Sequence, residues 1–191
     1  MKNRCPWCGT DSLYVQYHDE EWGVPIYDSR KLFAKLILDG AQAGLSWITI
    51  LRKRENYYRA FDGLNPDIMA TYGEEKVAEL LQNAGIVRNQ QKIWAAVRNA
   101  QAYVRMREAG IDFGVFLWQF VNGRPVQNAW RELSQLPAQT PASEAMSKAL
   151  KQHGFSFVGP TICYAFMQAV GMVNDHLTSC FRYEAVRVLS G

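Results

Sequence analysis

The stretch LLQNAGIVR, residues 80–88, indicates how the chain folds, because a helix, a tight turn and a second helix meet there. Gly85 stands where a residue in the left-handed conformation commonly ends a helix. A basic helix is expected to follow within a few positions, so residues 74–107 have the layout of a helix–hairpin–helix. Four apolar residues form one stripe on the first helix, which is expected over residues 74–84: Val77, Leu80, Leu81 and Ala84.

A hairpin of this kind could hold a phosphate oxygen of DNA. Its backbone N–H groups lie near a helix N-terminus, where an anion is stabilised, and the contact does not depend on base sequence. In this interpretation Ile86 anchors the hairpin in the core, while Arg88 and Lys92 add positive charge. Glycine also ends many helices that bind nothing, so an ordinary turn between helices explains the pattern as well.

Helical periodicity covers most of the remaining chain and predicts an all-α fold. Ser29 is expected to cap a helix that ends near Asp39 and Gly40. The most apolar helix is expected over residues 160–169, near the centre of the molecule. We expect residues 1–191 to form a single unit, with two helical lobes around a groove.

The composition is that of an ordinary globular protein, with 48% hydrophobic residues, 20% charged residues and a net charge of +3. The first residues are polar and no apolar segment follows them, so no secretory signal is expected. The most apolar stretch, residues 158–173, is interrupted by glycine, proline and glutamine and does not suit a bilayer. A cytoplasmic protein without a membrane partner is therefore expected.

Charge is segregated along the chain. Residues 85–107 contain five arginines and lysines and no acidic residue, whereas the segment from residue 11 to residue 28 is acidic. Such segregation suits a face that meets a polyanion, and it suits a solvated helix face equally well.

Cysteine and histidine occur together near both ends of the chain. Cys5 and His18 lie near one end, and His176 and Cys180 lie four residues apart near the other. Two thiolates and two imidazoles complete a tetrahedral zinc site with no open position, which is the arrangement of a structural site. Cys8 could replace Cys5 as the thiolate, since both belong to a C-x-x-C sequence.

Aromatic residues are dense around one carboxylate. The segment that carries Asp39 is flanked by Tyr14, Tyr17, Trp22 and Trp47. A purine flipped out of DNA needs flat faces on which to stack and a polar group for its edge, and aromatic faces also attract a cationic base. Aromatic residues at helical spacing are more often core residues, so this interpretation also has a structural alternative.

Four long strings, in order along nearly the whole chain, resemble the 3-methyladenine DNA glycosylase I family. They are YHDEEWGVP (17–25), QAGLSW (42–47), FVGPTICY (157–164) and VNDH (173–176). The resemblance implies a helix–hairpin–helix DNA glycosylase fold whose termini are tied by a structural Zn²⁺. It identifies four residues with the zinc ligands of the family and so favours Cys5 over Cys8: Cys5, His18, His176 and Cys180.

The same resemblance implies a base pocket and a segment that enters DNA. Tyr17 and Trp47 correspond to residues that contact the excised base, and Tyr14 and Trp22 complete the pocket. Three residues correspond to the segment that fills the space left by the flipped base: Gln42, Gly44 and Leu45. The implied partner is double-stranded DNA that contains alkylated bases, and no obligate protein partner is expected.

The chain departs from the family at Asp39, where the family typically has glutamate. The shorter side chain places the carboxylate roughly 1–1.5 Å further from the base edge if the backbone is unchanged. Asp39 is nevertheless the expected catalytic carboxylate. Because no lysine is obviously placed as a Schiff-base nucleophile, a monofunctional enzyme that releases 3-methyladenine by hydrolysis is expected. The alternatives are a glycosylase with an altered lesion preference and a non-catalytic, zinc-stabilised DNA-binding module.

Overall fold

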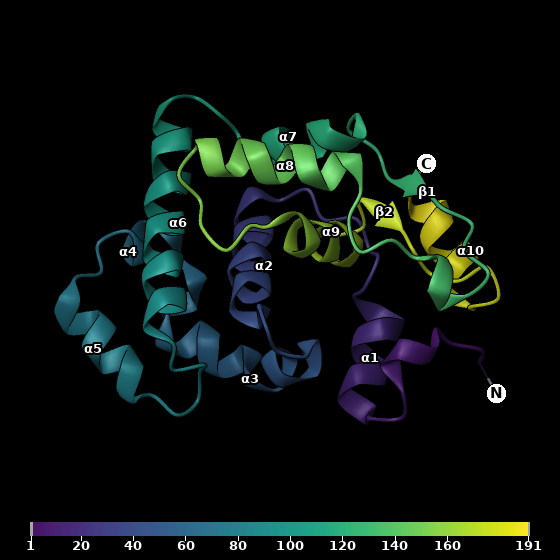
Figure 1. Ribbon diagram of the computed structural model, residues 1–191, viewed down its shortest axis with the longest axis horizontal. Helices are drawn as coiled ribbons and strands as arrows, with labels where there is room; N and C mark the ends of the chain where they lie inside the picture. Colours follow the sequence, from purple (N-terminus) through teal and green to yellow (C-terminus); the bar gives the residue numbers. More distant parts are fainter. Residues whose placement is uncertain (1, 191) are drawn as a thin grey trace.

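The chain is mostly helical, as predicted, in the computed structural model, which describes residues 2–190 (Figure 1). Its two short strands, β1 (Val126–Gln127) and β2 (Val173–Asn174), pair in parallel. The helices are α1 (Ser12–Glu20), α2 (Ser29–Gln42), α3 (Trp47–Ala60), α4 (Pro66–Met69), α5 (Glu74–Gln82), α6 (Gln90–Glu108), α7 (Phe113–Trp118), α8 (Pro141–Gln152), α9 (Pro160–Ala169) and α10 (Arg182–Arg187).

Helix α2 lies at the centre of the molecule and contacts α3, α6, α7 and α9 (Figure 1). Its apolar face is buried, as the spacing of Leu32, Phe33 and Leu36 predicts. Helix α9 has the predicted bounds and packs on α2 and α8. Buried apolar side chains from Cys5 to Cys180 form one continuous cluster, so the core joins the two ends of the chain.

The start of α2 differs from the prediction by one residue. Asp28, not Ser29, is the N-cap, and its carboxylate accepts a hydrogen bond of 2.8 Å from the amide of Lys31. The hydroxyl of Ser29 instead bonds to the start of α7, where it donates to the N-cap residue Asp112 and accepts from the amide of Gly114. This side chain therefore ties α2 to α7.

The end of α2 also differs, because the helix continues through Gly40 to Gln42. A Cβ atom at Gly40 would lie 3.6 Å from Phe157, so a small residue lets the two segments pack closely. The helix ends before Gly44, whose φ of +76° few other residues adopt. Asp39 therefore lies within the helix, three residues before its last residue.

Gly85 does not adopt the predicted left-handed conformation, and α5 ends at Gln82, earlier than expected. A Cβ atom at Gly85 would lie 2.9 Å from Oδ1 of Asn83 and 3.0 Å from Cγ of Asn56. Glycine is therefore required here for close approach of α3 to the turn, which is a packing requirement rather than a backbone one.

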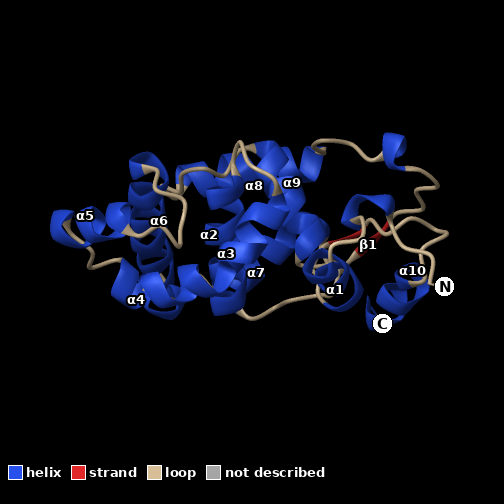
Figure 2. Cartoon of the chain, turned by 90° about the horizontal axis from the view of Figure 1, so that it is seen from below, coloured by secondary structure: helices blue, strands red, loops and turns tan. Residues whose placement is uncertain are grey.

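Both termini lie at one end of the elongated molecule, and α5 lies at the other (Figure 2). The amide of Phe181 donates to the carbonyl of Asn3 at 2.9 Å, and the side chain of Asn3 donates to the carbonyl of Ser179 at 2.7 Å. Over residues 2–190, no helix combines the length and apolar character that a membrane span requires.

Candidate functional site

The four predicted metal ligands lie together between the two ends of the chain: Cys5, His18, His176 and Cys180. Their ligand atoms all lie within 4.8 Å of one another, and all four residues are buried. The thiolate–imidazole distances are 3.6 Å from Cys5 to His176, 3.5 Å from Cys180 to His18 and 3.7 Å from Cys180 to His176. A tetrahedral zinc ion with its usual bond lengths gives sulfur–nitrogen edges of about 3.6 Å. The cluster thus has the size of such a site.

Both imidazoles have partners that orient them toward the cluster. Nδ1 of His18 lies 2.8 Å from Asp19, whose carboxylate accepts two parallel hydrogen bonds from Arg4. Nε2 of His176 lies 3.0 Å from the carbonyl of Trp22. The remaining ring nitrogens, Nε2 of His18 and Nδ1 of His176, therefore face the two sulfur atoms. Metal-binding histidines are commonly oriented in this way by a hydrogen bond at the other ring nitrogen.

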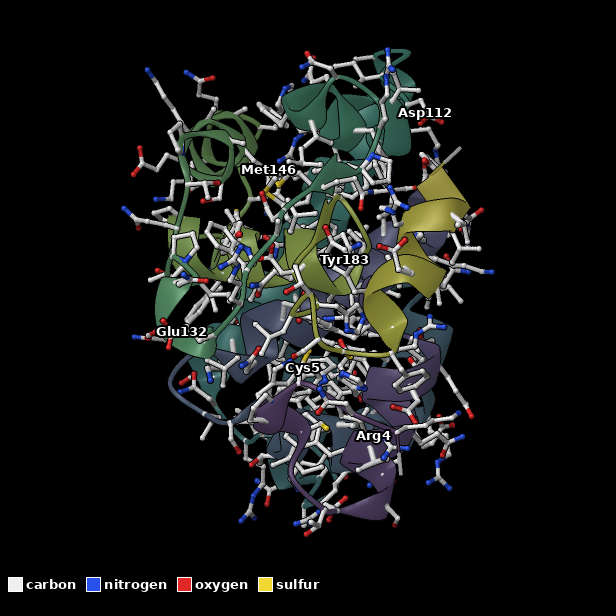
Figure 3. The ribbon with its side chains drawn as sticks, turned by 90° about the vertical axis from the view of Figure 1, so that its right-hand side faces the viewer. Arg4, Cys5, Asp112, Glu132, Met146 and Tyr183 are labelled. Atoms are coloured by element: carbon white, nitrogen blue, oxygen red, sulfur yellow. The ribbon has the colours of Figure 1, made fainter. Side chains whose placement is uncertain are left out.

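The thiols also fit a metal. Amides of Leu177 and Arg182 each lie 3.4 Å from a cluster sulfur atom, and the pKa of Cys180 lies below its usual value because Cys5 and both imidazoles bond to its sulfur. Figure 3 shows Cys5 where the N-terminal and C-terminal segments meet. Cys8 lies outside the cluster, since its thiol donates to the carbonyl of Cys5 at 3.2 Å.

The predicted base-pocket residues also come together, around one cavity of about 270 Å³. Small-molecule sites have volumes of roughly 300–1,000 Å³, so the cavity suits a small flat ligand. The walls come from η1 (Pro6–Cys8), α1, α2, α3 and α9, with the loop before α8 at one side. The predicted residues that line the cavity are Tyr14, Tyr17, Trp22, Asp39, Gln42 and Trp47.

Asp39 is the most buried polar group of this cavity, with 1% of its surface exposed. Oδ1 pairs with the ammonium of Lys35, and Oδ2 is buried without a hydrogen-bond partner. Burial raises the pKa of Asp39, and Lys35 acts in the opposite direction. A buried acceptor without a partner costs free energy, so Oδ2 is a group that a bound ligand can satisfy.

Lys35 was not predicted as a site residue from the sequence; its ammonium lies 3.9 Å from the centre of the Trp47 ring and beside Asp39. Burial lowers its pKa, and Asp39 opposes that effect. A signal was present in the sequence, because residues four apart share one face of a helix. Lys35 therefore had to face the same way as Asp39.

Trp7 was also missed, and it forms the wall between Tyr14 and Trp22, with ring centres 5.1 Å and 4.9 Å away. The ring of Tyr17 lies 6.4 Å from that of Trp7 and 5.5 Å from that of Trp47, and burial raises the pKa of Tyr17 well above its ordinary value. The indole N–H groups of Trp7 and Trp47 are buried without acceptors. The cavity is further lined by Leu133, Leu136, Ala165, Gln168 and Ala169.

Leu45 and Gly44 lie exposed at the end of α2, beside the cavity residue Gln42. Lys92 does not point freely into solvent. Its ammonium donates to the carbonyls of Ala41 at 2.8 Å and Ala43 at 2.5 Å, so it holds this loop against α6.

The turn between α5 and α6 places Ile86 in the core, with 3% exposure, and leaves Arg88 exposed. Its amides are used within the protein, however. The amide of Gly85 donates to Oδ1 of Asn83, that of Ile86 to the carbonyl of Asn83, and that of Val87 to the hydroxyl of Tyr57. These three N–H groups are not available to a phosphate in this conformation.

In this helical scaffold, aromatic walls surround a buried carboxylate and two indole N–H groups without acceptors. Such a cavity is typical of a protein that binds a flat ring with polar edges. The chain belongs to the methyladenine glycosylase family, whose model matches residues 7–183.

Similar proteins cover nearly the whole chain. DNA-3-methyladenine glycosylase 1 of Escherichia coli is 53% identical over 94% of this chain and 96% of its own length. A crystal structure of 3-methyladenine DNA glycosylase I is 54% identical and covers 94% of this chain and 98% of its own, with a TM-score of 0.93. A Tyr→Phe variant of 3-methyladenine DNA glycosylase I in complex with 3-methyladenine is 37% identical, with coverage of 94% and 96% and a TM-score of 0.90.

Proposed function

We propose that this protein is a DNA glycosylase that excises 3-methyladenine from alkylated double-stranded DNA by hydrolysis. The observation that carries the proposal is the carboxylate of Asp39, which is buried beside an aromatic cavity with one oxygen unpartnered. The names of the relatives, at about half identity over the whole chain, agree with it.

The substrate supplies much of the chemistry. Methylation at N3 makes the adenine cationic, so the glycosidic bond is already weak and the base leaves as a neutral purine. Asp39 accepts a hydrogen bond from the base edge and stabilises its positive charge, and Tyr17 donates a further hydrogen bond. Trp47 stacks on the ring, with Tyr14 and Trp22 as the other walls. Water attacks the sugar carbon as positive charge develops there.

The replacement of glutamate by Asp39 shortens the reach of the carboxylate. Because Asp39 is fixed within α2 rather than on a loop, the base must enter more deeply or a water molecule must bridge the gap. Both arrangements keep the charge interaction, so 3-methyladenine remains the favoured lesion.

The enzyme is proposed to be monofunctional. Lys35 is the lysine that lines the cavity, and it pairs with Asp39 as an ammonium. A protonated amine is not a nucleophile, so Lys35 does not form a Schiff base with the sugar.

DNA is proposed to bind across the end of α2 and the turn between α5 and α6, which would serve as a helix–hairpin–helix. Leu45 and Gly44, with Gln42, enter the space left by the flipped base, and Lys92 holds their loop. The exposed Arg88 contacts phosphate, and Gly85 and Ile86 shape the turn by packing. The single folding unit, the cytoplasmic location and the absence of an obligate protein partner remain predictions from the sequence.

Zn²⁺ is the metal proposed for the cluster of Cys5, His18, His176 and Cys180. The sulfur–nitrogen spacing and the oriented imidazoles fit it, and four protein ligands leave no position for substrate. The metal would supply stability by joining the two ends of the chain, and the chemistry of excision would be left to the cavity.

The deciding experiment measures release of free 3-methyladenine from methylated duplex DNA by the wild type and by Asp39→Asn. We expect release by the wild type and a loss of about a hundredfold in the variant, as for removal of one preorganised polar group. If Asp39→Asn released the base as fast as the wild type, Asp39 would have no role in excision.

Two outcomes would favour the alternatives. The first is that the folded, zinc-loaded wild type releases no base from methylated DNA. Oligonucleotides with other modified bases are then tested with the wild type and with Asp39→Glu. Release from one of them would show an altered lesion preference. A module without catalysis would bind every duplex and release no base.

A further inference from the structure

Lys35 occupies the place in the cavity that a cationic base needs. Its ammonium pairs with Asp39 and lies over the face of Trp47, 3.9 Å from the ring centre. A carboxylate and an aromatic face are the two groups that hold a cation best in a dry site. A side chain of the protein thus makes the two contacts that the proposed function assigns to the methylated base.

We propose that Lys35 holds this position only in the free protein, that the cationic base displaces its ammonium, and that its return expels the product. The inference rests on the proposed function and makes Lys35 a specificity-determining residue. It concerns which bases enter the cavity and how they leave.

The geometry allows such an exchange. The Lys35 side chain is 14% exposed, and its long flexible stem can carry the ammonium out of the cavity. The Asp39 side chain, only 2% exposed and on a regular helix, cannot follow it. Once the ammonium has left, the buried carboxylate lacks a counter-charge, and a ligand that brings a positive charge restores one.

This requirement separates damaged from normal bases. A base methylated at N3 is cationic within DNA and replaces the charge of Lys35. Unmodified adenine is neutral, so its entry leaves Asp39 without a counter-charge at low dielectric. Lys35 therefore rejects normal adenine by making its entry costly, in addition to any effect of cavity shape.

The same charge change favours release of the product. When the glycosidic carbon–nitrogen bond breaks, its electron pair stays on the base, which becomes neutral. The sugar carbon takes the oxygen of water, and the water proton passes to solvent. The neutral purine no longer compensates Asp39, so the return of Lys35 restores the ion pair and displaces the base.

The test measures binding of free 3-methyladenine, which is neutral at pH 8, to wild type and Lys35→Met by calorimetry at that pH. Loss of the competing ammonium is expected to tighten binding about tenfold or more. Lys35→Arg keeps the charge and should bind as weakly as wild type. Lys31→Met, an exposed position one turn earlier on α2, is the matched control and should not change binding.

The kinetics supply a second measurement. Lys35→Met should show a burst of base release followed by slower turnover, and a smaller ratio of 3-methyladenine to adenine excision. Binding of the free base that is equal to or weaker than in wild type would overturn the proposal and leave Lys35 as a structural partner of Asp39.

Two controls keep the test decisive. If Lys35→Met does not fold, the double variant with Asp39→Asn carries no unpaired charge and should bind the neutral base more tightly than Asp39→Asn alone. If it does not, the proposal fails. Failure of the proposed function is distinguishable, because the wild type would then release no 3-methyladenine from DNA, whatever its affinity for the free base.

Discussion

Two buried aspartates show how differently the cavity and the region of the cysteine–histidine cluster are built. Asp39 lies in the cavity, and Asp175 directly precedes His176 of the cysteine–histidine cluster in the chain; the two residues are 1% and 2% exposed. Asp39 has one partner, Lys35, and one oxygen without any. Asp175 accepts four hydrogen bonds of 2.6–2.9 Å, from Asn128, Trp130, Tyr164 and Gln168. A fully satisfied carboxylate fixes a structure, whereas an unsatisfied one is poised to bind.

The contrast extends to the neighbouring groups. In the cluster, each imidazole is oriented by a second partner and each sulfur accepts a backbone amide. In the cavity, the indole N–H groups of Trp7 and Trp47 have no acceptor. We infer that one region is optimised for stability and the other for recognition, and that variants should separate the two properties.

Loss of a cluster ligand is expected to have the largest effect. Cys180→Ser should lower the free energy of unfolding by about 5 kcal/mol, because metal binding and folding are coupled. For a chain of this size that corresponds to a fall in Tm of about 10–20 °C. Calorimetry together with metal content by mass spectrometry checks this.

Cys8→Ser is the matched control, because Cys8 is a buried cysteine beside the cluster and outside it. It should retain the metal and most of the stability. Equal losses of metal and Tm in both variants would contradict the assignment of the ligands.

The two aspartates provide a sharper separation. Asp175→Asn should cost about 2–4 kcal/mol of stability, because an amide N–H₂ then faces donors that need an acceptor. Asp39→Asn should change stability by about 1 kcal/mol or less, since the flexible Lys35 side chain can carry its unpaired ammonium to solvent and the amide needs no counter-charge. Denaturant unfolding of both variants, compared with their excision rates, measures this. A larger stability loss in Asp39→Asn would reverse the comparison.

The smallest effect concerns pH. Because burial raises the pKa of Asp39, its ionised form is lost as pH falls through a value above the ordinary 3.8. Excision should therefore fall on acidification with a midpoint above 3.8. Lys35 acts to lower that pKa, so the midpoint should move higher still in Lys35→Met. Excision rates at subsaturating concentrations, which report the groups of the free protein, test this across the acid range, with the fold monitored by circular dichroism. A midpoint at or below 3.8 would contradict it.

Much of this molecule was predictable from its sequence. Two cysteines and two histidines form a complete ligand set, so residue types predicted the cluster, and the resemblance to the family favoured Cys5 over Cys8. The periodicity of α2 and α9 predicted the core. The aromatic side chains near Asp39 do line one cavity, although their roles toward a base remain to be tested.

The failures have physical causes. Lys35 looks like a surface residue on an amphipathic helix, and only the three-dimensional position of Trp47 shows that its ammonium is covered. Gly85 was interpreted from backbone conformation, whereas contact with Asn56 on another helix explains it. Gln168 reaches the cavity from a distant segment, a tertiary contact that no local pattern encodes.

The cluster also sets the order in which these parts of the protein can fold during synthesis. Cys5 leaves the ribosome before its partner His176, which follows 171 residues later. At a synthesis rate of roughly 5–20 residues per second, the early segment waits on the order of ten to thirty seconds for that partner. Trp22 lines the cavity and lies against His176, with ring centres 4.6 Å apart. The cavity wall can therefore reach its final position only after His176 has been synthesised, so a shorter nascent chain has no finished binding site to offer DNA.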